Sequence, residues 1–354
     1  MLKIRIATEE DDALLREVLR TEALPGKIQL FYLREPHFFK SFTNQASTTE
    51  IIVGEDDQGV AGICGSSTWD VYVNGQKDRI GYIHSLRIHP RHRNSLAFGR
   101  GIRFFNTLHK DGAVKVYLAT VITGRRSAEG IITSGRHFLP KAFFLGKCHT
   151  YAVPLARRRG LDPMPGLEIR KAGKADALDV REFYQAHAHG RQFAFQEPAY
   201  LEDEEIYLAF KKNCLVGILS AYHDPSHQIR IADYPTFLKI FVRAGNWTRR
   251  LRGMRNYPLV GDFVVSYYVR FALVSDFDPK VFRALFLHAY NDLIERGDFL
   301  TVSLFENDPL RAGLRGIFKI SYPTNLYFFH WENGSEWVQR YDATKIPVID
   351  PGVL

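Results

Sequence analysis

The chain has 354 residues, of which 45% are hydrophobic and 13% aromatic, and its formal net charge is +8. This length favours two domains over one, and the apolar content excludes an intrinsically disordered chain. The three cysteines, Cys64, Cys148 and Cys214, are too scattered for a disulfide framework or a Cys-x-x-Cys pair, so we expect no metal and a reducing, cytoplasmic setting. No apolar run approaches the roughly 20 residues of a membrane span, so we expect no membrane partner. The positive charge suits a polyanionic ligand.

The first predicted elements are a short strand and a helix, followed by paired strands. The strand ends at Ala7, and Thr8 is placed to cap a helix whose acidic first turn suits the positive end of the helix dipole. Asn74-Gly75 is a strong signal for a hairpin turn. The strands that follow the helix are predicted as two hairpins, at residues 51–53, 60–67, 69–73 and 79–88.

The stretch from Tyr82 to Leu108 predicts a strand, a tight basic turn and a helix. Pro90 ends the strand because it cannot donate to a sheet, and Asn94 or Ser95 can cap the helix. The buried face of the helix consists of residues spaced by four and three, namely Phe98, Ile102 and Phe105. The turn carries Arg91, His92 and Arg93 beside a helix N-terminus, which attracts anions. We therefore predict a pyrophosphate site, with an ordinary turn and solvated arginines as the alternative.

The residues Leu86-x-Ile88-x-Pro90-x-x-Arg93 resemble the central motif of the GNAT superfamily of acyl-CoA N-acyltransferases. The resemblance implies that the strand backbone pairs with the pantetheine arm of acetyl-CoA, or of another acyl-CoA, and that the loop N–H groups hold the pyrophosphate. The small positions of the motif fall on Leu96 and Phe98, while Gly99 and Gly101 come three residues late. In the family, the aromatic-rich region at 27–48 forms a substrate-side wall, although core packing explains it equally well. The cofactor-binding residues implied are Leu86, Arg87, Ile88, Arg91, Arg93, Asn94, Ser95, Leu96, Ala97, Phe98, Gly99 and Arg125.

Acyl transfer to an amine needs one group that removes a proton from the amine and another that protonates the leaving thiolate. His84 lies near the position where relatives often carry a Glu, and its unperturbed pKa of about 6.5 suits a general base. A hydrogen-bonded core histidine is an equal alternative. The tyrosine that serves as the acid in the family is replaced by Ile132, and the candidates that remain are Tyr117, Thr123 and Ser127.

The opening of the chain repeats after a basic linker at residues 156–166. Leu167-Glu-Ile-Arg170-Lys-Ala172 matches Leu2-Lys-Ile-Arg5-Ile-Ala7 at an offset of 165, and Asp176 falls on Asp11. The repeat predicts an α+β fold of two tandem GNAT-like domains, each a mixed, mostly antiparallel sheet flanked by helices. We expect an acyl-CoA-binding N-terminal domain at 1–155 with closing strands at 143–154, a degenerate C-terminal domain at 167–345 and a tail at 346–354.

The second copy differs from the first where the cofactor should bind. Its central strand is expected at 263–274, and the turn that follows carries Asp276 and Asp278 instead of arginines. Two carboxylates beside a helix N-terminus satisfy its dipole and repel pyrophosphate. We therefore expect one coenzyme for each chain, held by the first copy.

A basic and partly aromatic segment, from Lys239 to Arg255, precedes that strand. It predicts an amphipathic helix with a solvated basic face, and a polyanion-binding patch is the alternative.

Together these residues predict an enzyme, an acyl-CoA-dependent N-acyltransferase, with acetyl as the expected acyl group. The expected acceptor is a primary amine of a small molecule or a peptide. Aminoacyl and long fatty acyl groups stay open, because tandem relatives transfer them. The alternative is a non-catalytic tandem protein that binds a CoA-like ligand or a partner protein, which Ile132 and the substituted glycines favour. Nucleic acid is not an expected partner, because only basic charge points to it, and a homodimer stays open.

Overall fold

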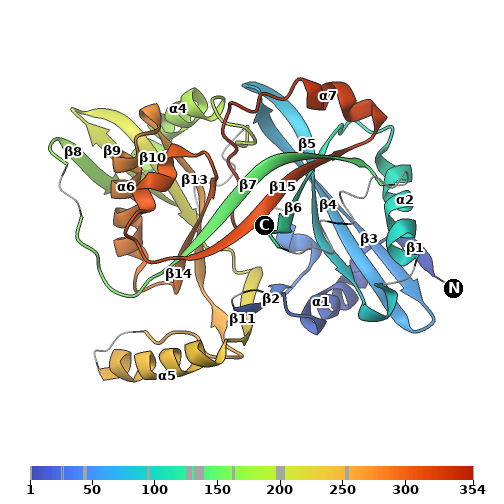
Figure 1. The fold of residues 1–354 in the computed structure, drawn as a ribbon. Coiled ribbons are helices and arrows are strands. Elements are labelled where there is room, and N and C mark those ends of the chain that lie inside the picture. Colours follow the sequence, from blue (N-terminus) through green and yellow to red (C-terminus); the bar gives the residue numbers. More distant parts are fainter. Residues whose placement is uncertain are drawn as a thin grey trace.

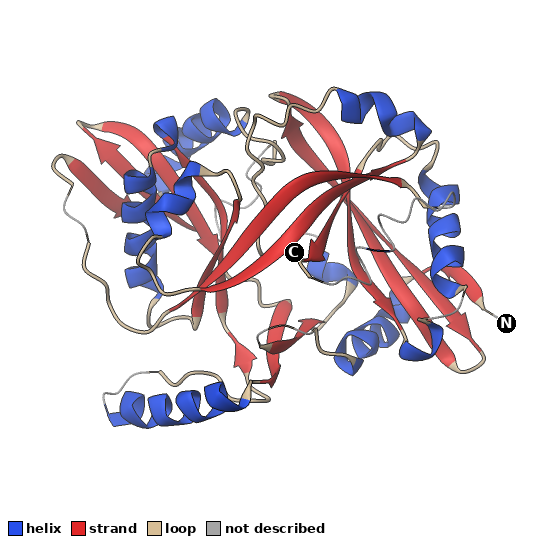
Figure 2. Cartoon of the chain, viewed as in Figure 1, coloured by secondary structure: helices blue, strands red, loops and turns tan. Residues whose placement is uncertain are grey.

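The computed structural model describes residues 2–24, 26, 28–42, 46–93, 96–124, 130, 139–161, 164–196, 204–251 and 255–353. These residues form a twelve-stranded sheet and a three-stranded sheet with helices packed on them (Figures 1 and 2). The first half contains β1 (Lys3–Ile6), α1 (Asp12–Thr21), β2 (Gln29–Arg34), β3 (Thr48–Asp56), β4 (Gly59–Val73), β5 (Gln76–Ile88), α2 (Ala97–His109), β6 (Tyr117–Ile122) and β7 (Lys141–Pro154). The second half contains β8 (Leu167–Lys171), α4 (Ala177–Ala188), β9 (Glu205–Lys211), β10 (Cys214–Tyr222), β11 (His227–Asp233), α5 (Thr236–Leu251), β12 (Phe263–Val264), β13 (Ser266–Val274), α6 (Pro279–Leu293), β14 (Phe299–Phe305), β15 (Ile320–His330) and α7 (Ser335–Gln339).

The large sheet has the strand order β1-β3-β4-β5-β6-β15-β7-β14-β13-β10-β9-β8. The order of the strands is the same when it is read inward from either edge of the sheet, because β1-β3-β4-β5-β6 corresponds to β8-β9-β10-β13-β14. Neighbouring strands are antiparallel except for the pairs β5–β6 and β13–β14, which are parallel. The predicted α+β fold with two similar, mostly antiparallel halves is confirmed.

The last strand of each half lies beside the other half. β7 pairs with β14, and β15 pairs with β6, while β7 and β15 also pair with each other and so make the sheet continuous. Figure 1 shows this pair crossing the centre of the molecule in green and red. Residues 143–154 therefore do not close the first half as expected, because β15 takes the place beside β6. The division at 155 and 167 stays a prediction.

The sequence repeat has a structural basis in an aspartate at the start of each half, which is buried at Asp11 and partly buried at Asp176. Arg5 donates to Asp11 from Nη1 and Nη2 over 2.7 and 2.8 Å, and Arg170 donates to Asp176 over 2.7 and 2.6 Å. In each copy this aspartate also accepts a backbone N–H three residues earlier, from Thr8 and Gly173. The repeated Arg and Asp therefore hold the turn between the first strand and the first helix.

The helices α1 and α2 cover opposite faces of the first half. Side chains of β3 alternate between the faces, so that Ile51 and Val53 pack with Leu15 of α1 and Ile52 packs with Phe105 of α2. In the second half α6 is buried along most of its length against β9, β10 and β13. No helix in the described parts of the chain is both long and apolar enough to cross a bilayer.

The small sheet joins the two halves. Its order is β12-β11-β2, and β2 of the first half pairs with β11 of the second from Arg34↔His227 to Gln29↔Asp233. Helix α5 follows β11 and projects from this side of the molecule, at the lower left of Figure 1. The small sheet therefore forms a contact between the two halves, and it also places the basic segment predicted at 239–255, because α5 follows β11.

Candidate active site

Strands β5 and β6 separate in the middle of the first half. Their parallel pairing runs only from Gly81↔Tyr117 to Ile83↔Ala119, whereas β5 continues to Ile88. Among the described residues, β5 has no strand partner on this side beyond Ile83. Alternate peptide groups of residues 84–88 are thus directed to an edge that a ligand can pair with. This is the segment that was predicted to bind the pantetheine arm.

The predicted pyrophosphate turn follows directly. Residues 90–92 form a 3₁₀ turn, and α2 begins at Ala97 with Leu96 in the N-cap position. The first hydrogen bond within the helix runs from Arg100 N to Leu96 O over 3.0 Å, so the amides of Phe98 and Gly99 point out of the N-terminus. Such a terminus favours an anion. The predicted caps, Asn94 and Ser95, lie outside the described residues.

Both arginines of the turn are paired with carboxylates. Arg91 Nη2 donates to Asp56 Oδ1 over 2.9 Å, and His92 Nε2 lies 2.9 Å from the other oxygen of Asp56. Arg93 Nη2 lies 2.5 Å from both carboxylate oxygens of Glu22. Sequence reasoning did not find these two acidic partners, which are the last residue of β3 and the residue that follows α1. The Arg93 pair is half exposed, so a phosphate can replace Glu22 at little cost.

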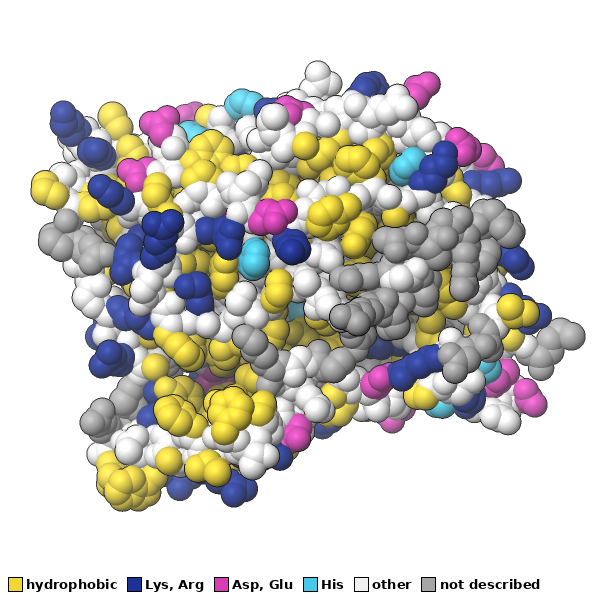
Figure 3. Space-filling model, in the orientation of Figure 1, with side chains coloured by type: hydrophobic (Ala, Val, Ile, Leu, Met, Phe, Trp, Pro, Cys, Tyr) yellow, Lys and Arg dark blue, Asp and Glu magenta, His cyan; other side chains and the backbone are white. Residues whose placement is uncertain are grey.

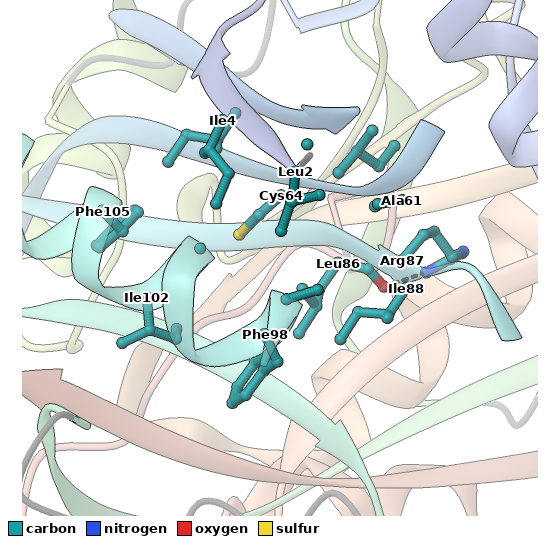
Figure 4. Close-up of a pocket in the computed structure, with 16 residues that line it drawn as sticks. Leu2, Ile4, Ala61, Cys64, Leu86, Arg87, Ile88, Phe98, Ile102 and Phe105 are labelled. Atoms are coloured by element: carbon teal, nitrogen blue, oxygen red, sulfur yellow. Dashed lines mark hydrogen bonds between the residues drawn. The ribbon is translucent and has the colours of Figure 1, made fainter. Parts of the chain in front are cut away.

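The glycines near the turn belong to the helix. Gly99 is the third residue of α2 and Gly101 the fifth, so the loop is not lengthened to place them against a phosphate. A Cβ at Gly101 would meet nothing within 4 Å. Phe98 occupies a small position of the motif, and its side chain lines an apolar pocket beneath α2 (Figure 4). A bulky residue at this position is therefore accommodated as a half-buried side chain against the pocket.

The apolar pocket lies between α2 and the sheet (Figure 4), with an empty volume of about 540 Å³ that includes the part open to solvent. Leu86 and Ile88 belong both to its wall and to the open end of β5. Other lining residues come from β1, β3, β4 and α2, and they include Ile4, Ile52, Cys64, Ile102 and Phe105. Burial raises the pKa of the Cys64 thiol to about 12, so this thiol stays protonated. In the described part of the chain no group of three or more His, Cys, Asp or Glu side chains is arranged to hold a metal.

His84 lies just beyond the point where β5 and β6 separate. Its Nε2 is 2.9 Å from Ser67 Oγ, its Nδ1 is 3.0 Å from Ser85 Oγ, and its ring packs on Phe42 at 4.6 Å between centroids. Burial and, second, the positive charge of Arg34 lower the pKa of His84 to about 3. The imidazole is therefore neutral at neutral pH, and the pKa of about 6.5 that we expected for His84 from the sequence is wrong. A role as general base stays a prediction.

Tyr117 begins β6 at the end where the two strands are still paired. Its side chain is buried under α2 against Phe105, His109 and Trp331, and burial raises its pKa. This environment favours a packing role for Tyr117. That Tyr117 protonates the leaving thiolate stays a prediction. Thr123 Oγ1 lies 3.2 Å from Asn325 Oδ1 of β15. Ser127 and Arg125 lie outside the described residues.

A buried arginine that sequence reasoning missed lies near His84. Arg34 ends β2, its guanidinium lies 4.3 Å from the centre of the Phe42 ring, and its Nη1 donates to Ser41 O over 3.3 Å. Burial and the charge of Arg34 also lower the pKa of His227, its partner on β11, to about 3. A positive charge is thus held between the halves beside neutral imidazoles. The only sequence signal for it is the aromatic-rich region at 27–48.

The second half has an equivalent separation of strands, and the chain itself occupies it. β13 and β14 are parallel from Ser266↔Phe299 to Tyr268↔Thr301, after which β13 continues to Val274. Residues 347–349, near the end of the described chain, line the space between these strands together with Arg191. Arg191 Nη1 is 2.8 Å from Asp308 Oδ2, and both side chains are almost completely buried. The ion pair and the C-terminal segment leave a pocket of about 300 Å³ of empty volume.

The turn after β13 supplies its own anion to the following helix. Asp278 Oδ1 accepts the backbone N–H of Lys280 over 2.8 Å and caps α6. The predicted effect of this carboxylate on the helix dipole therefore has a direct structural counterpart. A carboxylate at this helix N-terminus disfavours a phosphate there, and one coenzyme for each chain stays a prediction.

Comparison with known proteins identifies the fold. No family model and no curated protein matches the sequence. A GCN5-related N-acetyltransferase from Anabaena variabilis is similar in structure with a TM-score of 0.51 at 13% identity, over 93% of this chain and 72% of that one. Saccharomyces cerevisiae N-myristoyltransferase with bound myristoyl-CoA is similar with a TM-score of 0.55 at 14% identity, over 93% of this chain and 82% of that one. At such identities the likeness concerns the fold alone, and it confirms the prediction: this chain has the tandem GNAT fold.

Proposed function

We propose that this chain is an acyl-CoA-dependent N-acyltransferase that transfers an acyl group, acetyl in the simplest case, to a primary amine. One observation carries the proposal: the open end of β5 leads directly into a basic turn and the N-terminus of α2. The amides of a pantetheine arm can pair with a strand edge, and a pyrophosphate suits a helix N-terminus flanked by arginines.

The residues present fit such a cofactor. Peptide groups of 84–88 would pair with the arm, and the amides of Phe98 and Gly99 with Arg91 and Arg93 would hold the pyrophosphate. When bound, the thioester supplies an activated acyl group. By analogy with the family, a backbone N–H near Leu86 would polarise the carbonyl.

The groups around His84 would keep the acceptor amine neutral. The buried charge of Arg34 disfavours a second cation nearby, so an amine that enters this region would lose its proton more readily. His84 is neutral and both of its ring nitrogens are bonded to serine hydroxyls, so a proton released by the attacking amine would reach the unprotonated nitrogen through the hydroxyl of Ser67 or Ser85. We expect the coenzyme in the first half only, because the equivalent separation in the second half is occupied.

Titration calorimetry with CoA and acetyl-CoA tests the cofactor, and thiol release in the presence of small and peptidic amines tests the reaction. We expect a stoichiometry near one and thiol release that depends on the amine. Absence of binding to either coenzyme contradicts the proposal. Binding without thiol release for any amine supports the non-catalytic alternative, which the replacement of the family tyrosine by Ile132 favours.

A longer acyl group is a second candidate, because an apolar pocket adjoins the open end of β5. Leu86 and Ile88 link the two, so a fatty acyl chain leaving the thioester could enter beneath α2. A series of acyl-CoA chain lengths separates the candidates. Gly101→Leu adds a side chain inside the pocket, so it should reduce turnover of long chains at least tenfold and leave acetyl transfer unchanged. Equal effects on both would show that the pocket does not hold the acyl chain.

A further inference from the structure

Helix α5 directs five large apolar side chains to solvent, while its Leu238 and Val242 pack against the small sheet. Its buried side carries polar residues that fix its orientation: Asn246 Nδ2 donates to Tyr257 O over 2.9 Å, and Arg249 Nε donates to Arg255 O. Five large apolar side chains are between 67% and 74% exposed, namely Phe237, Ile240, Phe241, Trp247 and Leu251. At the rotation of a helix, about 100° per residue, they fall within an arc of about 120°. We call these five residues the α5 apolar face.

The α5 apolar face is large for a surface without a partner. Five such side chains at these exposures present on the order of 600 Å² of apolar area, which equals the largest patches of typical monomers. Figure 3 shows apolar side chains gathered at the lower left, where α5 projects in Figure 1. Burial of this face by another component is therefore favourable.

The charge carried by the segment itself is entirely positive. Residues 234–261 contain no Asp or Glu, and they contain Lys239, Arg243, Arg249, Arg250, Arg252 and Arg255. Arg243 and Arg250 are exposed on α5, and their helical positions follow one edge of the apolar face. Lys239 lies on the same edge and pairs with Asp233 over 2.7 Å. The arrangement is an apolar strip with cationic residues along its border.

We propose that α5 binds the surface of an anionic lipid bilayer. The α5 apolar face would enter the boundary between head groups and acyl chains, where Trp is favoured, and Arg243 and Arg250 would contact anionic head groups. The expectation of no membrane partner rested on the absence of a spanning segment, and binding in the plane of the surface needs none. This proposal does not depend on the acyltransferase function.

Two other occupants fit less well. A second copy of the chain would bring two basic helices together, and like charges placed opposite each other disfavour such a contact. A nucleic acid would use the positive charge but would leave Phe237, Ile240 and Leu251 in water. Of these three occupants, the anionic bilayer is the one that matches both the charge and the apolar face.

Cosedimentation of the full chain with lipid vesicles tests the proposal. We expect at least tenfold tighter binding to vesicles of equal parts phosphatidylcholine and phosphatidylglycerol than to phosphatidylcholine alone, with affinity falling as salt rises. Trp247 gives a second readout: it is exposed, Trp69 and Trp337 are buried and Trp331 is half-buried. Its emission should shift to shorter wavelength with the mixed vesicles, and Trp247→Phe should remove the shift.

Surface variants separate the two contributions. Ile240→Ser with Trp247→Ser should weaken vesicle binding more than tenfold. Arg243→Gln with Arg250→Gln should weaken it by about twenty-five-fold, at about fivefold for each charge. Phe318→Ser is the matched control, because Phe318 is 70% exposed outside α5, and it should change nothing.

Four results would overturn the proposal. The first is no binding to the mixed vesicles, and the second is binding that the serine variant leaves unchanged. The third is a dimer in sedimentation equilibrium that the serine variant dissociates while vesicles remain unbound, which would assign the face to a second copy. Binding of single-stranded DNA, but not of vesicles, that only the glutamine variant weakens would likewise replace the bilayer by a site for nucleic acid.

Discussion

Replacement of Arg93 by glutamate tests the predicted pyrophosphate site most directly. Arg93 and Glu22 are 48% and 43% exposed, so their ion pair contributes at most about 1 kcal/mol to the free energy of unfolding. Arg93→Glu should therefore change stability little. Its effect on coenzyme binding should be much larger, because a phosphate would lose a charge-assisted contact and meet a carboxylate instead.

The size of the effect follows from the charges. A unit charge about 5 Å from a phosphate interacts by about 3 kcal/mol at an effective dielectric near 20, and half exposure with salt reduces this to about half. Loss of the attraction and gain of some repulsion should weaken the binding free energy by at least about 2 kcal/mol, which raises the Kd roughly thirtyfold. Glu22→Gln should act in the opposite direction and tighten binding by up to about fivefold, because it frees Arg93 from a pair worth at most about 1 kcal/mol.

Titration calorimetry with CoA measures both changes, and urea unfolding checks stability. Arg79→Glu is the matched control, since Arg79 pairs with Asp70 over 2.7 Å, has comparable exposure and lies on β5 before the separation. It should leave the Kd unchanged. An equal loss in Arg79→Glu would indicate a general charge effect, and full affinity in Arg93→Glu would place the pyrophosphate elsewhere.

Three further predictions concern stability and pH. Burial lowers the pKa of His84 to about 3, so His84 should not titrate in the pH profile of kcat/KM near pH 6.5. His84→Asn should therefore leave the shape of that profile near pH 6.5 unchanged. The unfolded state binds the proton first as pH falls below about 6.5, so wild type should lose about 2 kcal/mol more than His84→Asn in urea unfolding between pH 7.5 and pH 5. Gly101→Ala should stabilise the protein by about 1 kcal/mol, because this helical position has open space around an added Cβ. Gly81→Ala should destabilise it by at least about 2 kcal/mol, because the added Cβ would lie 2.1 Å from the ring of Tyr117. The midpoints of urea unfolding of both variants check this. Arg191→Met should cost about 3–5 kcal/mol in thermal unfolding by leaving Asp308 buried without its ion-pair partner, and Asp308→Leu in the same chain should recover most of it.

The sequence by itself determined the local structure of the candidate site. Pro90 places the end of β5 at Ile88, and the apolar spacing after it places α2, which runs to His109. Asn74-Gly75 forms the expected hairpin turn, with positive φ values of 55° and 85° at its two residues. The repeated Arg and Asp at an offset of 165 correctly indicated two similar halves. In each case neighbouring residues carry the whole signal, because backbone hydrogen bonding and side-chain periodicity act over a few positions.

Only the tertiary structure decided what meets this local structure. The exchange of β7 and β15 between the halves, the pairing of Arg91 with Asp56 and of Arg93 with Glu22, and the occupied separation in the second half all join residues far apart in the chain. Burial and, second, the charge of Arg34, which lies 50 positions earlier, lower the pKa of His84. Periodicity tells which face of an element is buried, but the partner of that face is selected by packing of the whole chain, and burial and charge at the site follow from that partner.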